Sequence, residues 1–231
     1  MNVSLLYYAL KVSAVGGIVA ADETSYGQFM LSRPIAAGFL TGIATGNLML
    51  GTILGAVFEL LYIDVLPFGG SRFPTAGFAA VISVSICGYL GLSNILEAGG
   101  IIPLLFLYSA LTANIGGRLV VGVRRTNSRL LKTASGLVES GDYSKAGLIH
   151  CTGILVSFLR GFVTILVAFS LTVPFKELLE TRVLGSGPGS MYLLMPFVAL
   201  GLGIACKMYV TRRRIVHMFL GGFITILILY I

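Results

Sequence analysis

The chain has 231 residues, of which 56% are hydrophobic and 11% are charged, and its mean hydropathy of +0.96 lies far above that of soluble domains. These values exclude a separate soluble catalytic domain and predict a polytopic, all-α membrane protein with one membrane-embedded domain over residues 1–231. The formal charge of +7 does not indicate nucleic-acid binding, because the basic residues cluster at the ends of apolar stretches, as the positive-inside rule predicts.

The three cysteines, Cys87, Cys151 and Cys206, are widely spaced and each lies inside an apolar run. This pattern predicts buried small hydrophobic side chains, not a disulfide framework or a metal site. We therefore expect neither a metal nor a cofactor.

Residues 3–20 form the first predicted apolar helix, which ends at a polar corner over residues 22–25. Asp22 or Ser25 is expected to cap the next helix. The segment lacks a basic start and is interrupted by Lys11, so we expect it to belong to the mature fold and not to be a signal peptide.

The central stretch, residues 33–70, contains one carboxylate in an apolar setting: Glu59 is the only charged residue between Pro34 and Tyr62. An acid at membrane depth needs a partner and is a functional candidate. The stretch is longer than the roughly 20 residues of one span. Glycines recur every fourth residue up to Gly46, and the phase then slips by one. We therefore predict two short helices that meet at Gly46 and Asn47, as a re-entrant hairpin or as half-length helices.

The passage from Pro67 to Thr75 is rich in glycine and proline and cannot be regular helix. Its apolar flanks place it at membrane depth, where unwound backbone is typical of a transporter substrate site. An ordinary turn at the membrane interface is the alternative.

The remaining chain predicts further spans over residues 76–96, 101–123, 146–174, 191–210 and 215–231, for a total of about 6–9 membrane segments. The span at 101–123 is expected to bend or break near Pro103 and Gly116. Residues 124–145 carry a basic excess, which predicts a cytoplasmic loop that anchors to lipid, docks a cytoplasmic partner subunit, or does both. Residues 175–190 are then an outside loop, and the C-terminus lies outside or in the interface.

Two further polar residues lie in the span at 146–174. Arg160 lies at its middle, where a charge costs about 2.5 to 3.5 kcal/mol, so it should face the protein interior and pair with Glu59 or with an acid of a partner subunit. His150 lies about 80° around the helix from Arg160, so both can serve one face. A structural role for His150 is the alternative.

The motifs in this order resemble the membrane IIC subunit of the mannose/sorbose-type sugar phosphotransferase system. The matching residues are Arg33-Pro34, Gly46-Asn47, Gly55, Glu59-Leu60, Gly69, Pro74, Ile149-His150 and Arg160. Three positions depart from the family pattern: Asn47 and Thr75 stand where it has Asp, and Pro67 where it has Asn.

The resemblance implies a non-enzymatic subunit that moves a hexose-like sugar across the bacterial cytoplasmic membrane. Its implied partners are a IID membrane subunit, soluble IIA and IIB phosphocarriers, and lipid, in an oligomeric assembly. The expected substrate-binding residues are Glu59, Asn47, Gly69, Ser71, Arg72, Thr75, His150 and Arg160. Two alternatives stay open: an ion- or proton-coupled permease that uses Glu59 and Arg160 as a relay, and a membrane scaffold that does not transport.

Overall fold

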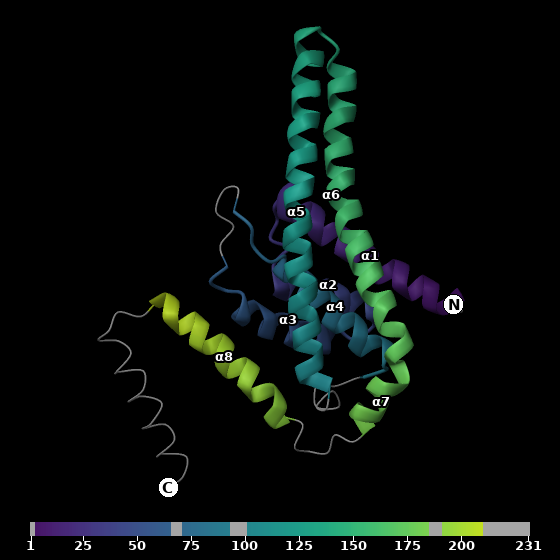
Figure 1. Ribbon diagram of the computed structural model, residues 1–231, viewed down its shortest axis with the longest axis vertical. Helices are drawn as coiled ribbons and strands as arrows, with labels where there is room; N and C mark the ends of the chain where they lie inside the picture. Colours follow the sequence, from purple (N-terminus) through teal and green to yellow (C-terminus); the bar gives the residue numbers. More distant parts are fainter. Residues whose placement is uncertain (1–2, 66–70, 93–100, 185–190, 210–231) are drawn as a thin grey trace.

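The computed structural model describes residues 3–65, 71–92, 101–184 and 191–209, and within these ranges the chain is entirely helical (Figure 1). The predicted all-α class with broken helices is confirmed. The helices are α1 Val3–Thr24, α2 Pro34–Thr45, α3 Leu48–Leu61, α4 Ala76–Tyr89, α5 Ile102–Glu139, α6 Tyr143–Thr172, the 3₁₀ turn η2 Val173–Phe175, α7 Lys176–Leu184 and α8 Met191–Tyr209.

Three described helical stretches are long and apolar enough to cross a membrane: Val3–Thr24, Ile102–Glu139 and Tyr143–Thr181. Four shorter apolar helices accompany them: Pro34–Thr45, Leu48–Leu61, Ala76–Tyr89 and Leu194–Lys207. Together these helices make the chain a multi-pass membrane protein.

The central stretch forms a tight helical hairpin of α2 and α3. Glycines on the two helices face each other so closely that a Cβ at Gly38 would lie 2.5 Å from the carbonyl oxygen of Gly51, and one at Gly55 would lie 2.8 Å from that of Pro34. Only glycine permits this approach of two backbones. The prediction that this stretch is not one continuous helix is confirmed.

The corner of the hairpin is made by Gly46 and Asn47. Gly46 adopts a left-handed φ of 81° and ends α2, which is the usual role of a glycine after a helix. Asn47 caps α3, because its side-chain oxygen accepts a hydrogen bond from Leu50 N at 3.1 Å, and its amide donates to Leu92 O at 2.9 Å. The break in glycine spacing therefore marks a capped helix start.

Helix α4 forms the centre of the core. Every residue from Gly77 to Cys87 is buried, and Phe78, the largest of them, is fully enclosed. A helix that is apolar all round has no solvent face and needs neighbours on every side. Helices α2, α3, α5, α6 and α1 supply them.

Helices α1 and α6 cross closely beside this core through small residues. A Cβ at Gly17 would lie 2.5 Å from the Phe158 ring, and one at Gly161 would lie 2.8 Å from the carbonyl carbon of Gly16. This close crossing is the typical geometry of small residues at membrane helix interfaces. It brings the end of α1 beside the middle of α6.

Residues 124–152, called the arm below, include the stretch 124–145 that was predicted as a loop, and the prediction of a loop is wrong. The arm is a helical hairpin in which α5 runs on to Glu139 and α6 begins at Tyr143, and no residue of it is buried. Its Arg, Lys and Leu residues are good helix formers, so a basic segment did not mean an irregular one. Figure 1 shows the arm projecting from the helical body.

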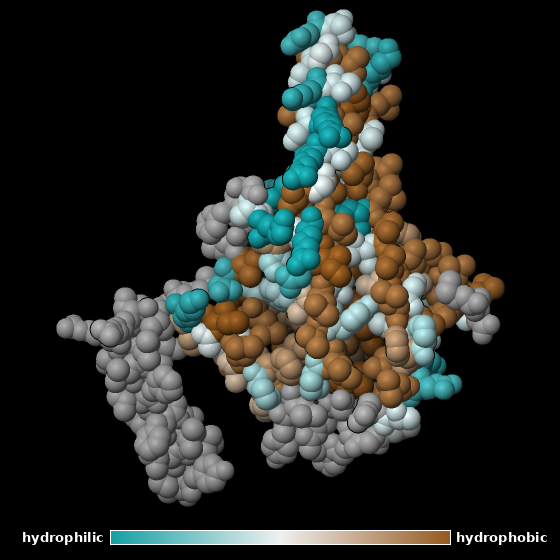
Figure 2. Space-filling view, in the orientation of Figure 1, coloured by the Kyte–Doolittle hydropathy of each residue, from teal (hydrophilic) through white to brown (hydrophobic). Residues whose placement is uncertain are grey.

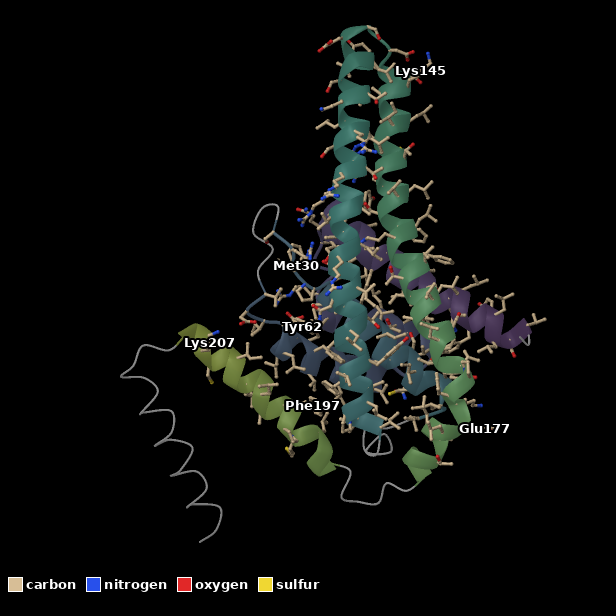
Figure 3. The ribbon with its side chains drawn as sticks, viewed as in Figure 1. Met30, Tyr62, Lys145, Glu177, Phe197 and Lys207 are labelled. Carbon is tan, nitrogen blue, oxygen red and sulfur yellow. The ribbon has the colours of Figure 1, made fainter. Side chains whose placement is uncertain are left out.

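The turn at the tip of the arm has clear local causes. Gly141 takes a φ of 83°, and Asp142 caps α6 by accepting from Lys145 N at 3.2 Å. The Lys145 ammonium also donates to Asp142 at 2.6 Å, and the hydrogen bonds from this ammonium and from the Lys145 backbone N–H hold the pKa of Asp142 below its usual value. Figure 3 shows Lys145 at the far end of the arm and Glu177 at the opposite end of the molecule.

Helix α5 is continuous where a bend was expected. Pro103 lies in its first turn, where a missing N–H breaks no helical bond. Gly116 and Gly117 give room to neighbours instead of bending the helix: a Cβ at Gly116 would lie 2.6 Å from the Phe78 ring, and one at Gly117 would lie 2.8 Å from the carbonyl carbon of Phe73.

The C-terminal third of the chain differs in part from the loops and spans predicted for it. The outside loop at 175–190 is helical in its first part, as η2 and α7. Helix α8 covers nearly all of the predicted span at 191–210 and packs on α3. The last span at 215–231 and the C-terminus lie outside the described residues, as do Pro67, Gly69 and positions 93–96 of the span at 76–96. Cys87 is buried as predicted, but Cys151 is exposed and Cys206 is half-buried.

Figure 2 shows how polarity is distributed over one face of the molecule. Hydrophilic side chains follow the α5 side of the arm, and hydrophobic ones cover α6 and the body below it. Exposed apolar residues on α6 include Leu155, Leu159 and Val163. An apolar outer surface of this kind is expected where helices face lipid.

Candidate functional site

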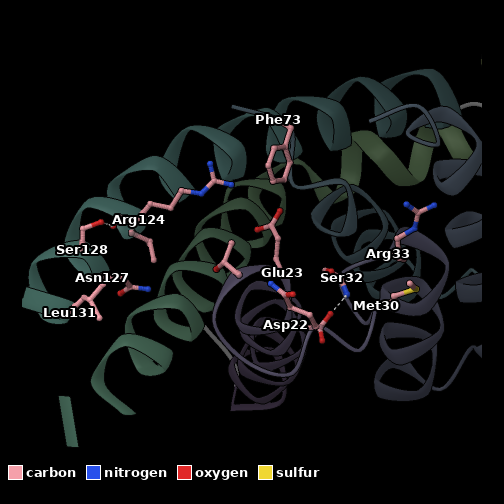
Figure 4. A pocket seen from close by; sticks show the side chains of 13 residues that line it. Asp22, Glu23, Met30, Ser32, Arg33, Phe73, Arg124, Asn127, Ser128 and Leu131 are labelled. Carbon is pink, nitrogen blue, oxygen red and sulfur yellow. Dashed lines mark hydrogen bonds between the residues drawn. The ribbon is translucent and has the colours of Figure 1, made fainter. Parts of the chain in front are cut away.

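A polar cavity lies where the end of α1 meets the base of the arm (Figure 4). Its volume is about 780 Å³, which falls within the usual range for small-molecule pockets. It is lined by Asp22, Glu23, Thr24, Gln28, Met30, Ser32, Arg33, Phe73, Val123, Arg124, Asn127, Ser128 and Leu131. Most of these side chains are polar, which is unusual for a hollow in so apolar a chain.

Glu23 lines the cavity and forms a buried ion pair with Arg160. Its Oε2 accepts from Arg160 Nη2 at 2.5 Å and from Thr75 Oγ1 at 3.3 Å, and the Glu23 and Arg160 side chains are only 9% and 3% exposed. Its Oε1 has no hydrogen-bond partner among the described residues. One oxygen of Glu23 therefore holds the fold together, and the other is available to a ligand.

Arg160 connects four helices through its guanidinium. Besides Glu23 at the end of α1, its Nη1 donates to Gly116 O on α5 at 3.1 Å and reaches Thr75 Oγ1, just before α4, at 3.4 Å. Its guanidinium also lies over the Phe78 ring at 5.4 Å. Its Nε is buried and lacks a partner in the described part of the chain. Arg160 itself, on α6, faces the protein interior as predicted.

Asp22 organises the loop that leads from α1 to α2. Its two carboxylate oxygens accept the backbone N–H groups of Phe29 at 2.6 Å and Ser32 at 2.9 Å, and the residue is 3% exposed. Asp22 thus stabilises a loop with two non-glycine residues of positive φ, Gln28 and Met30, which line the cavity. The expectation that Asp22 or Ser25 caps α2 is wrong: Ser25 bonds to Ser157, and the cap position, Arg33, makes no side-chain capping bond.

Glu59 pairs with Arg33, not with Arg160. The two side chains form an ion pair across the open end of the α2–α3 hairpin, and Glu59 Oε2 also accepts from Ile35 N, in the first turn of α2, at 3.3 Å. A carboxylate is favourable at a helix N-terminus. Arg33 lines the cavity, whereas Glu59 does not line it and contacts it only through Arg33.

Arg124 is held in a defined orientation at the cavity edge next to the arm. Its Nη1 donates to Ser71 O at 2.9 Å, and its guanidinium lies over the Phe73 ring at 5.3 Å. These contacts fasten residues 71–75, which come just before α4, to α5. Thr75 N adds a bond to Ala113 O at 2.9 Å.

The structure brings together some of the predicted binding residues and separates others. Thr75 and Arg160 meet at Glu23, Ser71 meets Arg124, and Glu59 supports Arg33. Asn47 lies at the hairpin corner, away from the cavity lining, and Arg72 is exposed. Gly69 lies outside the described residues.

His150 does not share a site with Arg160. It lines a second, smaller cavity of about 300 Å³ between the two helices of the arm, and Arg160 does not contribute to this cavity. The two cavities have Thr24, Asn127 and Leu131 in common. His150 is therefore near the polar cavity only through Asn127 and its neighbours.

Sequence reasoning did not identify Asp22, Glu23, Arg33 or Arg124 as site residues. The available signal was the pair of adjacent acids at the end of an apolar helix, which is costly near a membrane unless both charges are satisfied. No group of three His, Cys, Asp or Glu residues that could hold a metal occurs within the described ranges.

Comparison with known proteins identifies the family of this chain. The sequence profile of the family described as the PTS system sorbose-specific IIC component matches residues 6–231. The chain belongs to this family. Membership confirms the resemblance drawn from Arg33, Glu59 and their neighbouring motif residues, and it makes the chain a relative of phosphotransferase transport components.

Curated relatives of this IIC chain include transport proteins for several sugars. The mannose-specific EIIC component of Escherichia coli K12 is 24% identical over 162 residues, which cover 69% of this chain and 54% of the relative. The fructose permease IIC component of Bacillus subtilis 168 is 27% identical over 165 residues, with coverage of 71% and 56%. The aligned part of this IIC chain thus spans only about half the length of these relatives.

Two solved structures share the fold. One, described as the structure of a membrane protein, has a TM-score of 0.65 at 20% identity and covers 97% of this IIC chain and 87% of that chain. The other is the mannose transporter ManYZ in complex with microcin E492, with a TM-score of 0.58 at 20% identity and coverage of 97% and 86%.

Proposed function

We propose that this chain is the sugar-translocating IIC subunit of a phosphoenolpyruvate-dependent phosphotransferase system in a bacterial cytoplasmic membrane. Its substrate is a hexose-like sugar, and its partners are a IID membrane subunit and the soluble IIA and IIB phosphocarriers, in an oligomeric assembly. Family membership and the polar cavity support this proposal.

The observation that carries the proposal is that Oε1 of Glu23, in a cavity of about 780 Å³, has no hydrogen-bond partner among the described residues. A sugar presents several hydroxyl groups, and each needs an acceptor or a donor when it leaves water. The cavity offers a carboxylate acceptor at Glu23 and donor–acceptor groups at Gln28, Ser32 and Asn127. The Oδ1 of Asn127 is buried and unpartnered within the described chain, so a ligand hydroxyl or a water would satisfy it.

In this proposal, several of the predicted binding residues act through a neighbour that lines the cavity. Thr75 and Arg160 orient Glu23, and Glu59 orients Arg33, so these three act through a neighbour. Ser71 acts through Arg124. Asn47, Gly69, Arg72 and His150 stay in the proposed set on the family resemblance alone.

The chain contributes binding and passage and not the phosphoryl transfer itself. Phosphate is supplied by the IIB partner, for which the basic side of the arm is the proposed docking surface. The exposed Arg125, Arg129 and Lys132 give this surface a positive charge that steers an acidic partner. The apolar α6 side is free to face lipid or the IID subunit.

The geometry does not support a proton relay between Glu59 and Arg160. Each has a different ion-pair partner, Arg33 and Glu23 respectively, so no direct contact connects them. A proton-coupled permease therefore loses the residue pair on which it was based.

An uptake assay separates the functions. Cells that express the chain with its IID, IIA and IIB partners are given radiolabelled mannose, fructose or N-acetylgalactosamine, and the intracellular product is identified. Phosphorylated sugar that accumulates in the presence of a protonophore supports the proposal. Unmodified sugar whose accumulation the protonophore abolishes would indicate a proton-coupled permease, and no uptake of any sugar would favour a scaffold.

A further inference from the structure

Arg33 and Arg124 are the two cationic residues that line the cavity, and among the described residues only Arg33 has a countercharge. Arg33 pairs with Glu59, and Glu23 pairs with Arg160. Arg124 has no carboxylate within ion-pair distance in the part of the chain that the structure describes. Its polar contact is a carbonyl oxygen, Ser71 O, which uses one of the five guanidinium N–H groups.

The orientation of Arg124 is fixed without using its charge. The Phe73 ring holds one face of the guanidinium at 5.3 Å, and the bond to Ser71 holds one edge. A planar guanidinium restrained in this way loses little conformational freedom when it binds an anion through its remaining N–H groups. The side chain is half-buried and lines the cavity, so these groups are accessible from inside.

The charges around the cavity are unequally distributed. Asp22 and Glu23 lie at the α1 end of the cavity, while Arg124 lies on α5, where the arm begins (Figure 4). The exposed Arg125, Arg129 and Lys132 follow on the arm and add positive potential there. An anionic group would be repelled at the α1 end and attracted at the arm end.

We infer that Arg124 binds an anionic group of the ligand in this cavity, a phosphoryl group or a carboxylate, while the neutral hydroxyls face Asp22 and Glu23. The inference rests on the proposed function and deepens it. A sugar phosphate formed at the arm end supplies such a group, and so does an acidic sugar taken up as substrate. In either case the cavity discriminates charged from neutral sugars through Arg124.

The test is the dissociation constant of charged and neutral ligands for the full chain, co-expressed with its IID subunit and placed in lipid nanodiscs. The probes are mannose, fructose and N-acetylgalactosamine, their 6-phosphates, and glucuronate. Arg124→Gln should weaken the charged ligands by about tenfold to a hundredfold and the neutral sugars by less than about threefold. Arg124→Lys should lie between, because it keeps the charge and loses the planar fork.

Arg118→Gln is the matched control, because it removes the same charge from an exposed position of α5 that does not line the cavity. It should leave both classes of ligand nearly unchanged. A loss confined to the sugar phosphates identifies the phosphoryl group as the source of the anion, and a loss that includes glucuronate identifies a general anion site.

Equal weakening of neutral and charged sugars by Arg124→Gln would overturn the inference, since Arg124 would then only fasten Ser71 and Phe73. No change for any ligand would overturn it as well. If the wild-type chain bound no sugar and no sugar phosphate, the proposed function would fail first. The uptake assay would show that failure independently.

Discussion

Arg160 on α6 donates to Glu23 at the end of α1 across 2.5 Å, although the two residues are 137 positions apart in the chain. Both side chains are almost fully buried, so each charge is neutralised mainly by the other. The pair also connects the cavity wall to α4 and α5 through Thr75 and Gly116. Stability and binding are therefore coupled at this point.

Glu23→Gln should lower the free energy of unfolding by about 3 to 5 kcal/mol, because it leaves Arg160 buried without a countercharge. Thermal unfolding can be followed by the reaction of a fluorescent maleimide with the buried Cys87, in a variant in which Cys151 and Cys206 are replaced by Ser. The double variant Glu23→Gln, Arg160→Met should recover part of the loss. Strictly additive losses would show that the two residues are not coupled.

Gly38→Ala should open the α2–α3 hairpin, because the new methyl would lie 2.5 Å from Gly51 O and 2.8 Å from the Cα of Gly55. Overpacking of this kind costs about 1 to 3 kcal/mol, and rigid backbone on both sides places the expectation at the upper end. The same unfolding assay measures it.

Gly122→Ala is the control for the hairpin variant. Gly122 lies in α5, and a Cβ added there would meet no atom within 4 Å, so alanine should be neutral or stabilise the helix by up to about 1 kcal/mol. If Gly38→Ala were as stable as Gly122→Ala, the close hairpin packing would be wrong.

Glu59→Gln should weaken sugar binding by about tenfold to a hundredfold if Glu59 contacts the sugar. The ion pair with Arg33 gives a second route by which Glu59 can affect sugar binding, because Glu59 orients Arg33 at the cavity wall. The pair is partly exposed, so its loss should cost only about 0 to 1 kcal/mol of stability.

The two routes differ in a double-variant cycle with Arg33→Gln. If Glu59 acts through Arg33, the double variant should bind sugar no more weakly than the worse single variant. If Glu59 contacts the sugar itself, the two losses in binding free energy should add. Unchanged binding by Glu59→Gln in a correctly assembled complex would remove Glu59 from the site.

A cysteine at Ser135 should be protected from an impermeant thiol reagent in intact cells and labelled after permeabilisation. Ser135 is exposed on the arm, and the basic residues around it predict that the arm is cytoplasmic. Cys151 also lies on the arm and is exposed, so it must first be replaced by Ser. Labelling of Ser135→Cys in intact cells would show that the chain has the opposite orientation in the membrane.

The amino-acid sequence by itself determined the membrane class, the helical hairpin and the family. Each of these depends on local information: apolar length, the four-residue glycine spacing with its slip at Gly46, and motif residues such as Arg33 and Glu59. Local backbone rules sufficed for Asn47, because a helix cap is decided within three or four residues. At residues 124–145 the basic excess predicts a loop, but the structure shows helix over most of this segment.

Only the tertiary structure decided which charges pair and where the cavity lies. Glu59 and Arg160 are the two charges that stand out in apolar sequence, and the sequence alone favours a pair between them. The structure joins Glu59 to Arg33, at the other end of its own hairpin, and Arg160 to Glu23, at the end of α1. Electrostatic pairing depends on distance in space, and the packing of α1 against α6 sets that distance through contacts far apart in the sequence.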